Sequence, residues 1–154
     1  MQTEYQTNEV DITKPVENEI GVTRPVEITS PGKKILIVDD EEDICTFLSR
    51  NFNDRNFATS FSLTLKGALQ LIEAEEPDVL LLDNHLPDGL GVDFVGKIKS
   101  QYPKIKIVLI TAHDSSQDRM KAYSSGVNYF LSKPFSLSEI NKVVDSQLSG
   151  ESDE

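Results

Sequence analysis

Several features are scarce in this 154-residue sequence, and each absence excludes a class of protein. Cys45 is the only cysteine, so no intrachain disulfide can form, and no spacing of cysteine and histidine suits zinc. The neighbours Ile44, Phe47 and Leu48 favour a small buried side chain over a reactive thiol. No apolar run approaches the roughly 20 residues of a membrane-spanning helix, and nothing resembles a signal peptide. We therefore expect a soluble, cytoplasmic protein without a membrane contact.

Positive charge is also scarce. The sequence has 15 lysines and arginines against 26 aspartates and glutamates, which gives a formal net charge of −11. A chain of this charge is repelled by a phosphate backbone, so we expect no nucleic-acid partner. A basic protein partner remains compatible with this composition.

The chain divides into three parts by composition. Residues 1–33 are polar, contain three prolines and repeat a short motif, TKPVE at 13–17 and TRPVE at 23–27. Proline disfavours regular structure and the segment has little apolar surface, so we expect a disordered or extended tail. The alternative is a docking peptide or a strand added to a sheet edge. Residues 34–149 have the pattern of one folded domain, and 150–154 form an acidic tail.

Five apolar runs alternate with five segments of helical periodicity in the folded part. This alternation predicts an α/β fold, a parallel sheet with helices on both faces, because parallel strands need crossover connections. In the segment 41–55, helical spacing places Phe47 on the apolar stripe with Ile44, Leu48 and Phe52. The expected strands are 35–38, 57–61, 79–82, 105–110 and 127–131; the expected helices are 41–55, 64–75, 91–100, 115–124 and a last one that begins with a capping box at Ser136 and Glu139.

Four of the predicted strands are followed by polar side chains that suit one chemistry. They are Asp39 and Asp40, Asp83, Thr111, and Lys133. The carboxyl ends of parallel strands share one edge of a sheet, so these groups should lie close together. Two carboxylates about 4 Å apart repel by about 4 kcal/mol at an effective dielectric constant of about 20, which a raised pKa or a divalent cation would relieve. An all-oxygen cluster favours Mg²⁺, and the added ammonium and hydroxyl suit phosphoryl transfer.

The motifs around these residues resemble the receiver domain of two-component response regulators. The resemblance covers residues 34–149 and rests on the order and spacing of five fragments: IVDD at 37–40, LLD at 81–83, LPDG at 86–89, ITA at 110–112 and KPF at 133–135. It implies a flavodoxin-like (βα)5 fold, a doubly wound parallel five-stranded sheet in the order 2-1-3-4-5.

The resemblance also implies a role for each site residue. Asp83 looks like the phosphoacceptor. Asp40 and Asp83 look like direct ligands of Mg²⁺, together with the backbone carbonyl of His85, and Asp39 acts through water. Lys133 looks like the ionic partner of the phosphoryl group.

Two further residues match the family's conformational switch. Thr111 looks like the hydroxyl that closes on the phosphoryl group, and Phe130 like the aromatic side chain that turns inward; the alternative for Phe130 is a static core residue. The peptide bond before Pro134 is often cis in this family, which would aim Lys133 inward.

Both histidines stand at informative positions, two residues after Asp83 and two after Thr111. In the family, the side chains at the positions of His85 and His113 flank the phosphoryl group and tune its hydrolysis. The alternative is two exposed loop histidines. The sequence departs from the common pattern at Leu90, where an acidic residue usually precedes the second loop glycine.

The resemblance implies a signalling domain rather than an enzyme, with self-catalysed phosphotransfer and autodephosphorylation. A histidine kinase or a histidine phosphotransfer protein would supply the phosphoryl group, and the domain would then regulate an unknown target protein. No output domain is recognisable after Leu148, so we expect a stand-alone regulator, similar to the chemotaxis type. The alternatives are a phosphorelay intermediate, or a binding scaffold that uses the N-terminal tail; a phosphorylation-dependent homodimer is compatible with either.

Overall fold

A five-stranded parallel sheet forms the centre of the protein. The structure, a computed structural model, describes residues 32–150, so the predicted N-terminal tail with its repeats and the last four residues lie outside the described part. The sheet order is β3-β2-β4-β7-β8. In chain order this is second, first, third, fourth, fifth, as the resemblance implied. The strands are β2 (Lys34–Val38), β3 (Ala58–Ser62), β4 (Val79–Asp83), β7 (Lys106–Thr111) and β8 (Tyr129–Ser132).

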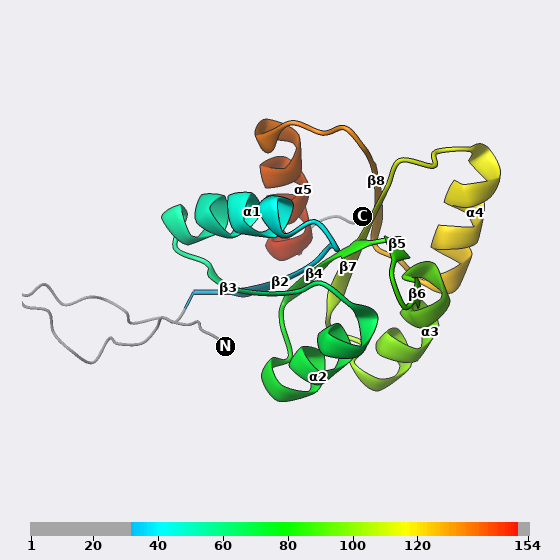
Figure 1. The fold of residues 1–154 in the computed structure, drawn as a ribbon, viewed down its shortest axis with the longest axis horizontal. Coiled ribbons are helices and arrows are strands. Elements are labelled where there is room, and N and C mark those ends of the chain that lie inside the picture. Colours follow the sequence, from blue (N-terminus) through cyan, green and yellow to red (C-terminus); the bar gives the residue numbers. More distant parts are fainter. Residues whose placement is uncertain (1–31, 151–154) are drawn as a thin grey trace, which may run out of the picture.

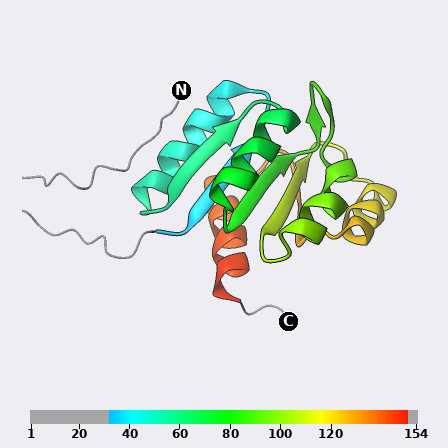
Figure 2. The same ribbon diagram turned by 90° about the horizontal axis from the view of Figure 1, so that it is seen from below.

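Helices cover both faces of this sheet (Figure 1), and Figure 2 views the molecule from the side of α2 and α3. On one face lie α1 (Glu42–Asp54) and α5 (Leu137–Ser149). On the other lie α2 (Leu65–Glu75), α3 (Val92–Gln101) and α4 (Ser116–Ser125). Among residues 32–150, no helix combines the length and the apolar character needed to cross a bilayer.

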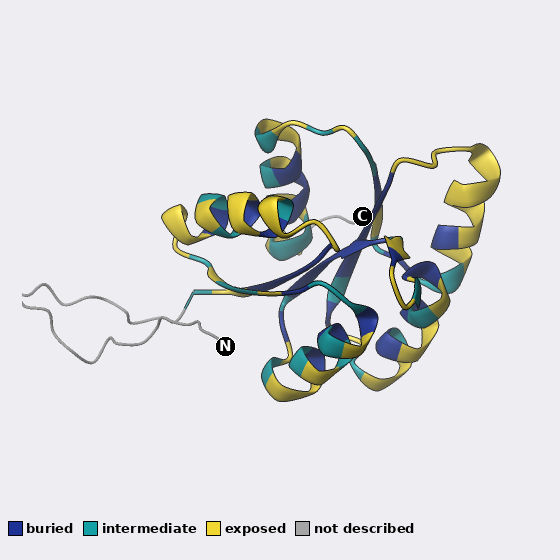
Figure 3. Ribbon diagram, viewed as in Figure 1, coloured by how far each residue is buried: buried dark blue, intermediate teal, exposed yellow. Residues whose placement is uncertain are grey.

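The core has two parts, one on each face of the sheet. Side chains alternate along a strand, so Ile35 and Ile37 of β2 pack toward α1 and α5, while Leu36 and Val38 pack toward α2 and α3. Central strands that are covered on both faces therefore read as continuous apolar runs. Figure 3 shows the result, with buried residues along the strands and on the inward sides of the helices.

One prediction about α1 is wrong. Phe47 does not belong to the buried stripe, because its side chain is 55% exposed. Residues spaced by three and four along a helix share a face, and here Cys45, Leu48 and Phe52 form that face. Cys45 is fully buried, as predicted, and burial raises the pKa of its thiol to about 12. Its Sγ donates a hydrogen bond to the backbone carbonyl of Asp39 over 3.3 Å.

A small hairpin between β4 and α3 was not predicted. Strands β5 (His85–Leu86) and β6 (Gly89–Leu90) pair in antiparallel fashion around a tight turn. Gly89 has a φ of +147°, a conformation that side-chain-bearing residues rarely adopt. Asp88 fastens the turn to the start of α2, where it accepts hydrogen bonds from the backbone amides of Leu65 and Lys66. These bonds hold the pKa of Asp88 below its ordinary value.

Candidate functional site

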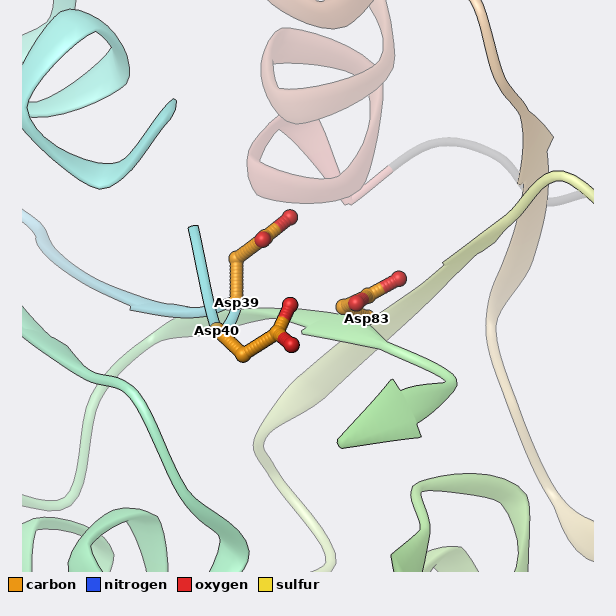
Figure 4. Close-up of side chains that lie close together, drawn as sticks. All are labelled: Asp39, Asp40 and Asp83. Carbon is orange, nitrogen blue, oxygen red and sulfur yellow. The ribbon is translucent and has the colours of Figure 1, made fainter. Parts of the chain in front are cut away.

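Three carboxylates meet at the carboxyl edge of the sheet. Asp39 and Asp40 directly follow β2, and Asp83 is the last residue of the neighbouring strand β4. One oxygen from each lies within 4.8 Å of the others, and Figure 4 shows the three side chains grouped over the strand ends. Asp39 and Asp83 are only 5% and 6% exposed, whereas Asp40 is exposed. The parallel arrangement predicted from the sequence thus brings these residues together.

Lys133 provides the positive charge of the site. It follows β8, and its Nζ lies 3.3 Å from Asp39 Oδ2 and 3.3 Å from Asp83 Oδ1. Burial by itself would lower the pKa of Lys133, but the negative charges of Asp83 and Asp39 raise it overall. The side chain therefore stays an ammonium. The peptide bond between Lys133 and Pro134 is cis, as the resemblance implied.

Burial disfavours the charged form of the Asp83 carboxyl group. Burial raises its pKa; the attraction of Lys133 offsets part of that shift, and the nearby charge of Asp39 adds to it. Asp39 is also oriented by the backbone amide of Glu41, which donates to its Oδ1 over 2.9 Å. Three acids against one ammonium leave an excess of negative charge, and an all-oxygen donor set of this kind suits a hard cation such as Mg²⁺.

Thr111 ends β7, the strand next to β4, and is 2% exposed. In this structure its hydroxyl accepts a hydrogen bond from the backbone amide of His113 over 3.0 Å. The hydroxyl is thus engaged with its own loop. A movement of Thr111 toward Asp83 would have to break or carry along this bond.

Phe130 lies on β8 beside Leu109 of β7 and is 3% exposed. Its ring and Thr111 line the same pocket of about 160 Å³. The backbone amide of Phe130 donates to the hydroxyl of Tyr123 over 3.0 Å, which connects β8 to α4. Thr111 and Phe130, predicted as a pair, therefore share one cavity.

The rings of the two histidines lie against each other in the lining of this pocket. The ring centroids of His85 and His113 are 4.5 Å apart, with the planes tilted by 45°. Both side chains are exposed, and both line the pocket that Thr111 also lines. The structure thus brings together two residues that follow different strands of the main sheet, His85 after β4 and His113 after β7.

A polar cluster beside Phe130 was not found from the sequence. Asp114 accepts hydrogen bonds from Arg119 and from the hydroxyl of Ser132. The three residues come from the loop after β7, from α4 and from the end of β8. In the sequence they look like ordinary surface residues, and no local pattern connects them.

The fold is a doubly wound parallel sheet whose carboxyl edge carries clustered acids, a lysine and a threonine. The family model of the response regulator receiver domain matches residues 35–145. The chain belongs to this family.

Known relatives support the same assignment. The response regulator protein PilR of Pseudomonas aeruginosa is 34% identical over 116 residues, which are 75% of this chain and 26% of PilR. The alkaline phosphatase synthesis transcriptional regulatory protein PhoP of Bacillus subtilis is also 34% identical over 116 residues, which cover 75% of this chain and 48% of PhoP. The chain thus spans less than half the length of these two relatives. Among solved structures, the BeF3-activated receiver domain of DrrB has a TM-score of 0.71 and 25% identity, and covers 77% of this chain and 98% of that one.

Proposed function

We propose that this protein is a phosphoacceptor of two-component signalling, and that Asp83 takes the phosphoryl group. The donor is the phosphohistidine of a histidine kinase or of a histidine phosphotransfer protein. The main support is the position of Lys133, whose Nζ lies 3.3 Å from Asp83 in a cluster with excess negative charge. The protein then acts in the cytoplasm as a signalling domain whose changed conformation regulates a protein partner.

Asp83 supplies the nucleophile. An oxygen of its carboxylate attacks the phosphorus atom, the bond between phosphorus and the histidine nitrogen breaks, and the imidazole keeps that electron pair and takes up a proton. The product is an acyl phosphate on Asp83. Lys133 is already charged beside the attacking oxygen, so it stabilises the phosphoryl oxygens without having to reorganise. Hydrolysis of the acyl phosphate by water returns Asp83 to its carboxylate.

Mg²⁺ is the cofactor that this oxygen-only donor set fits best. Asp40 and Asp83 would hold it directly with the backbone carbonyl of His85, and Asp39 would act through water. When bound, the ion would neutralise negative charge that develops on the phosphoryl oxygens.

The same residues give a conformational response. Phosphoryl oxygens on Asp83 attract the hydroxyl of Thr111, which is now bonded to the amide of His113. A shift of Thr111 changes the pocket that it lines with Phe130, and the orientation of Phe130 then selects between two states of α4 and β8.

The first test is labelling with acetyl phosphate and Mg²⁺, followed by intact mass. We expect one phosphoryl group on the wild type and none on Asp83→Asn. Asp93→Asn is the matched control, since Asp93 is an exposed acid on α3 whose Oδ1 lies 3.8 Å from Nζ of Lys121. Equal labelling of Asp83→Asn and the wild type would contradict the proposal.

A further inference from the structure

Arg119 lies over the ring of Phe130. The guanidinium carbon is 4.8 Å from the ring centroid, within the range of a cation–π contact. Two hydrogen bonds to Asp114 fix the guanidinium there, from Nε to Oδ1 over 2.6 Å and from Nη2 to Oδ2 over 3.1 Å. This two-pronged contact sets the plane of the guanidinium as well as its position.

Asp114 in turn joins the two segments that follow β7 and β8. It stands three residues after Thr111, and it accepts a hydrogen bond from the hydroxyl of Ser132. Ser132 directly precedes Lys133. One carboxylate therefore connects the segment that carries Thr111 with the segment that carries Lys133.

Helix α4 begins two residues after Asp114, at Ser116, with Ser115 as its N-cap. Ser115 and Asp118 form a capping box there, in which each side chain bonds to the other residue's backbone amide. A capped first turn resists fraying, so the start of α4 moves together with the loop that follows Thr111. A displacement of that loop therefore moves Arg119 in two ways, as part of α4 and through its hydrogen bonds to Asp114. Both connections act on the guanidinium of Arg119, which lies over the ring of Phe130.

We propose that Arg119 is a positioning residue that couples the Thr111 loop to Phe130. It holds the ring in its buried position and makes that position depend on Asp114. The coupling rests on the proposed function, because the loop is expected to move only when a phosphoryl group is on Asp83. Thermodynamic coupling is reciprocal: if Arg119 favours the buried ring, and a phosphoryl group favours the same state, then loss of Arg119 weakens the response to the phosphoryl group.

The test uses beryllofluoride with Mg²⁺ as a mimic of the phosphoryl group on the full chain. Arg119→Met removes the charge and the hydrogen bonds but keeps a long side chain. We expect the Kd for beryllofluoride to rise about two- to fivefold, the size of one exposed cation–π contact, while the Kd for Mg²⁺ alone stays unchanged. Asp114→Ala should give a similar rise, and the double variant should give no more than either single one.

Arg55→Met is the matched control. Arg55 also lies over an aromatic ring, 5.6 Å from the centroid of Phe57, and also pairs with an acid, Asp145, at 2.9 Å, but it stands on the opposite face of the sheet. We expect its Kd for beryllofluoride to equal that of the wild type. An unchanged or lower Kd in Arg119→Met, or an equal rise in Arg55→Met, would overturn the coupling. If the wild type binds Mg²⁺ but not beryllofluoride, the proposed function itself fails, and the coupling fails with it.

Discussion

Lys133 reaches Asp83 across an intervening strand. Its Nζ lies 3.3 Å from Asp83 Oδ1, although β7 separates β4 from β8 in the sheet. The ammonium therefore sits over the strand ends and is shared with Asp39. This ammonium should oppose the binding of a cation at the acid cluster and favour a phosphoryl group on Asp83.

Lys133→Met should strengthen Mg²⁺ binding and weaken phosphorylation. Without the ammonium, the acid cluster attracts a cation more strongly, and we expect the Kd for Mg²⁺ to fall by about two- to tenfold. The rate of labelling by acetyl phosphate should fall by about ten- to a hundredfold, because one preorganised charge is lost. Isothermal titration and intact mass measure the two effects. A fall in both Mg²⁺ affinity and labelling would indicate that the variant has lost the site's structure.

Asp83→Asn should stabilise the fold near neutral pH. Burial raises the folded-state pKa of Asp83 above its ordinary value of 3.8, even with Lys133 nearby. The unfolded chain therefore loses this proton first, and stability falls as the pH rises through the range between the two pKa values. We expect the variant to melt a few degrees higher than the wild type at about pH 7, and no difference at about pH 3.

Thermal unfolding without Mg²⁺ measures this effect. Asp93→Asn is the control, and it should melt at the same temperature as the wild type at both pH values. A lower melting temperature for Asp83→Asn at about pH 7 would show that attraction to Lys133 outweighs burial.

Cys45 should resist alkylation while the protein is folded. Its pKa of about 12, against an ordinary value of 9.0, reduces the thiolate fraction at about pH 8 by roughly a thousandfold, and burial blocks access further. Reaction with iodoacetamide, followed by intact mass, should be slow in buffer and fast in about 8 M urea. Similar rates in the two solutions would mean that α1 opens readily.

The histidine pair should control the lifetime of the acyl phosphate. The rings of His85 and His113 contact each other at the pocket that Thr111 lines, where an imidazole can orient the attacking water. We expect the lifetime in the variant His85→Ala, His113→Ala to increase by about two- to tenfold, and each single substitution to produce most of that effect, because each ring supports the other. Gln117→Ala, an exposed change on α4, is the control. A lifetime equal to that of the wild type would leave the pair as two surface histidines.

The sequence predicted every strand of the main sheet and every helix, with ends that differ by two residues or fewer from those observed. Buried parallel strands made this straightforward, because their apolar runs are continuous. The strand before α5 is predicted at 127–131 but starts at Tyr129, because α4 ends only at Ser125 and the amide of the buried Val127, just beyond it, donates back to the carbonyl of Ala122. The strand order came from the resemblance, since alternation alone does not fix it.

Each error or omission has its own physical cause. Apolar character does not tell which side of a helix faces the sheet, and Phe47 was misplaced for that reason. The hairpin after Asp83 consists of two-residue strands, too short for any periodicity to appear. The contacts of Asp114 with Arg119 and Ser132 depend on how separate segments meet in the fold, which no local pattern records.

The two parts of the core contain different residues of β8. Phe130 and Ala122 belong to the part that packs on α2, α3 and α4, whereas Leu131, the next residue of β8, belongs to the part under α1 and α5. Under the proposed function, a rearrangement around Phe130 therefore involves the part of the core that packs on α2, α3 and α4, while the part under α1 and α5 keeps its packing. We expect a partner that binds α1 and α5 to contact the same surface before and after phosphorylation. A partner that binds α4 should distinguish the phosphorylated form from the unphosphorylated one.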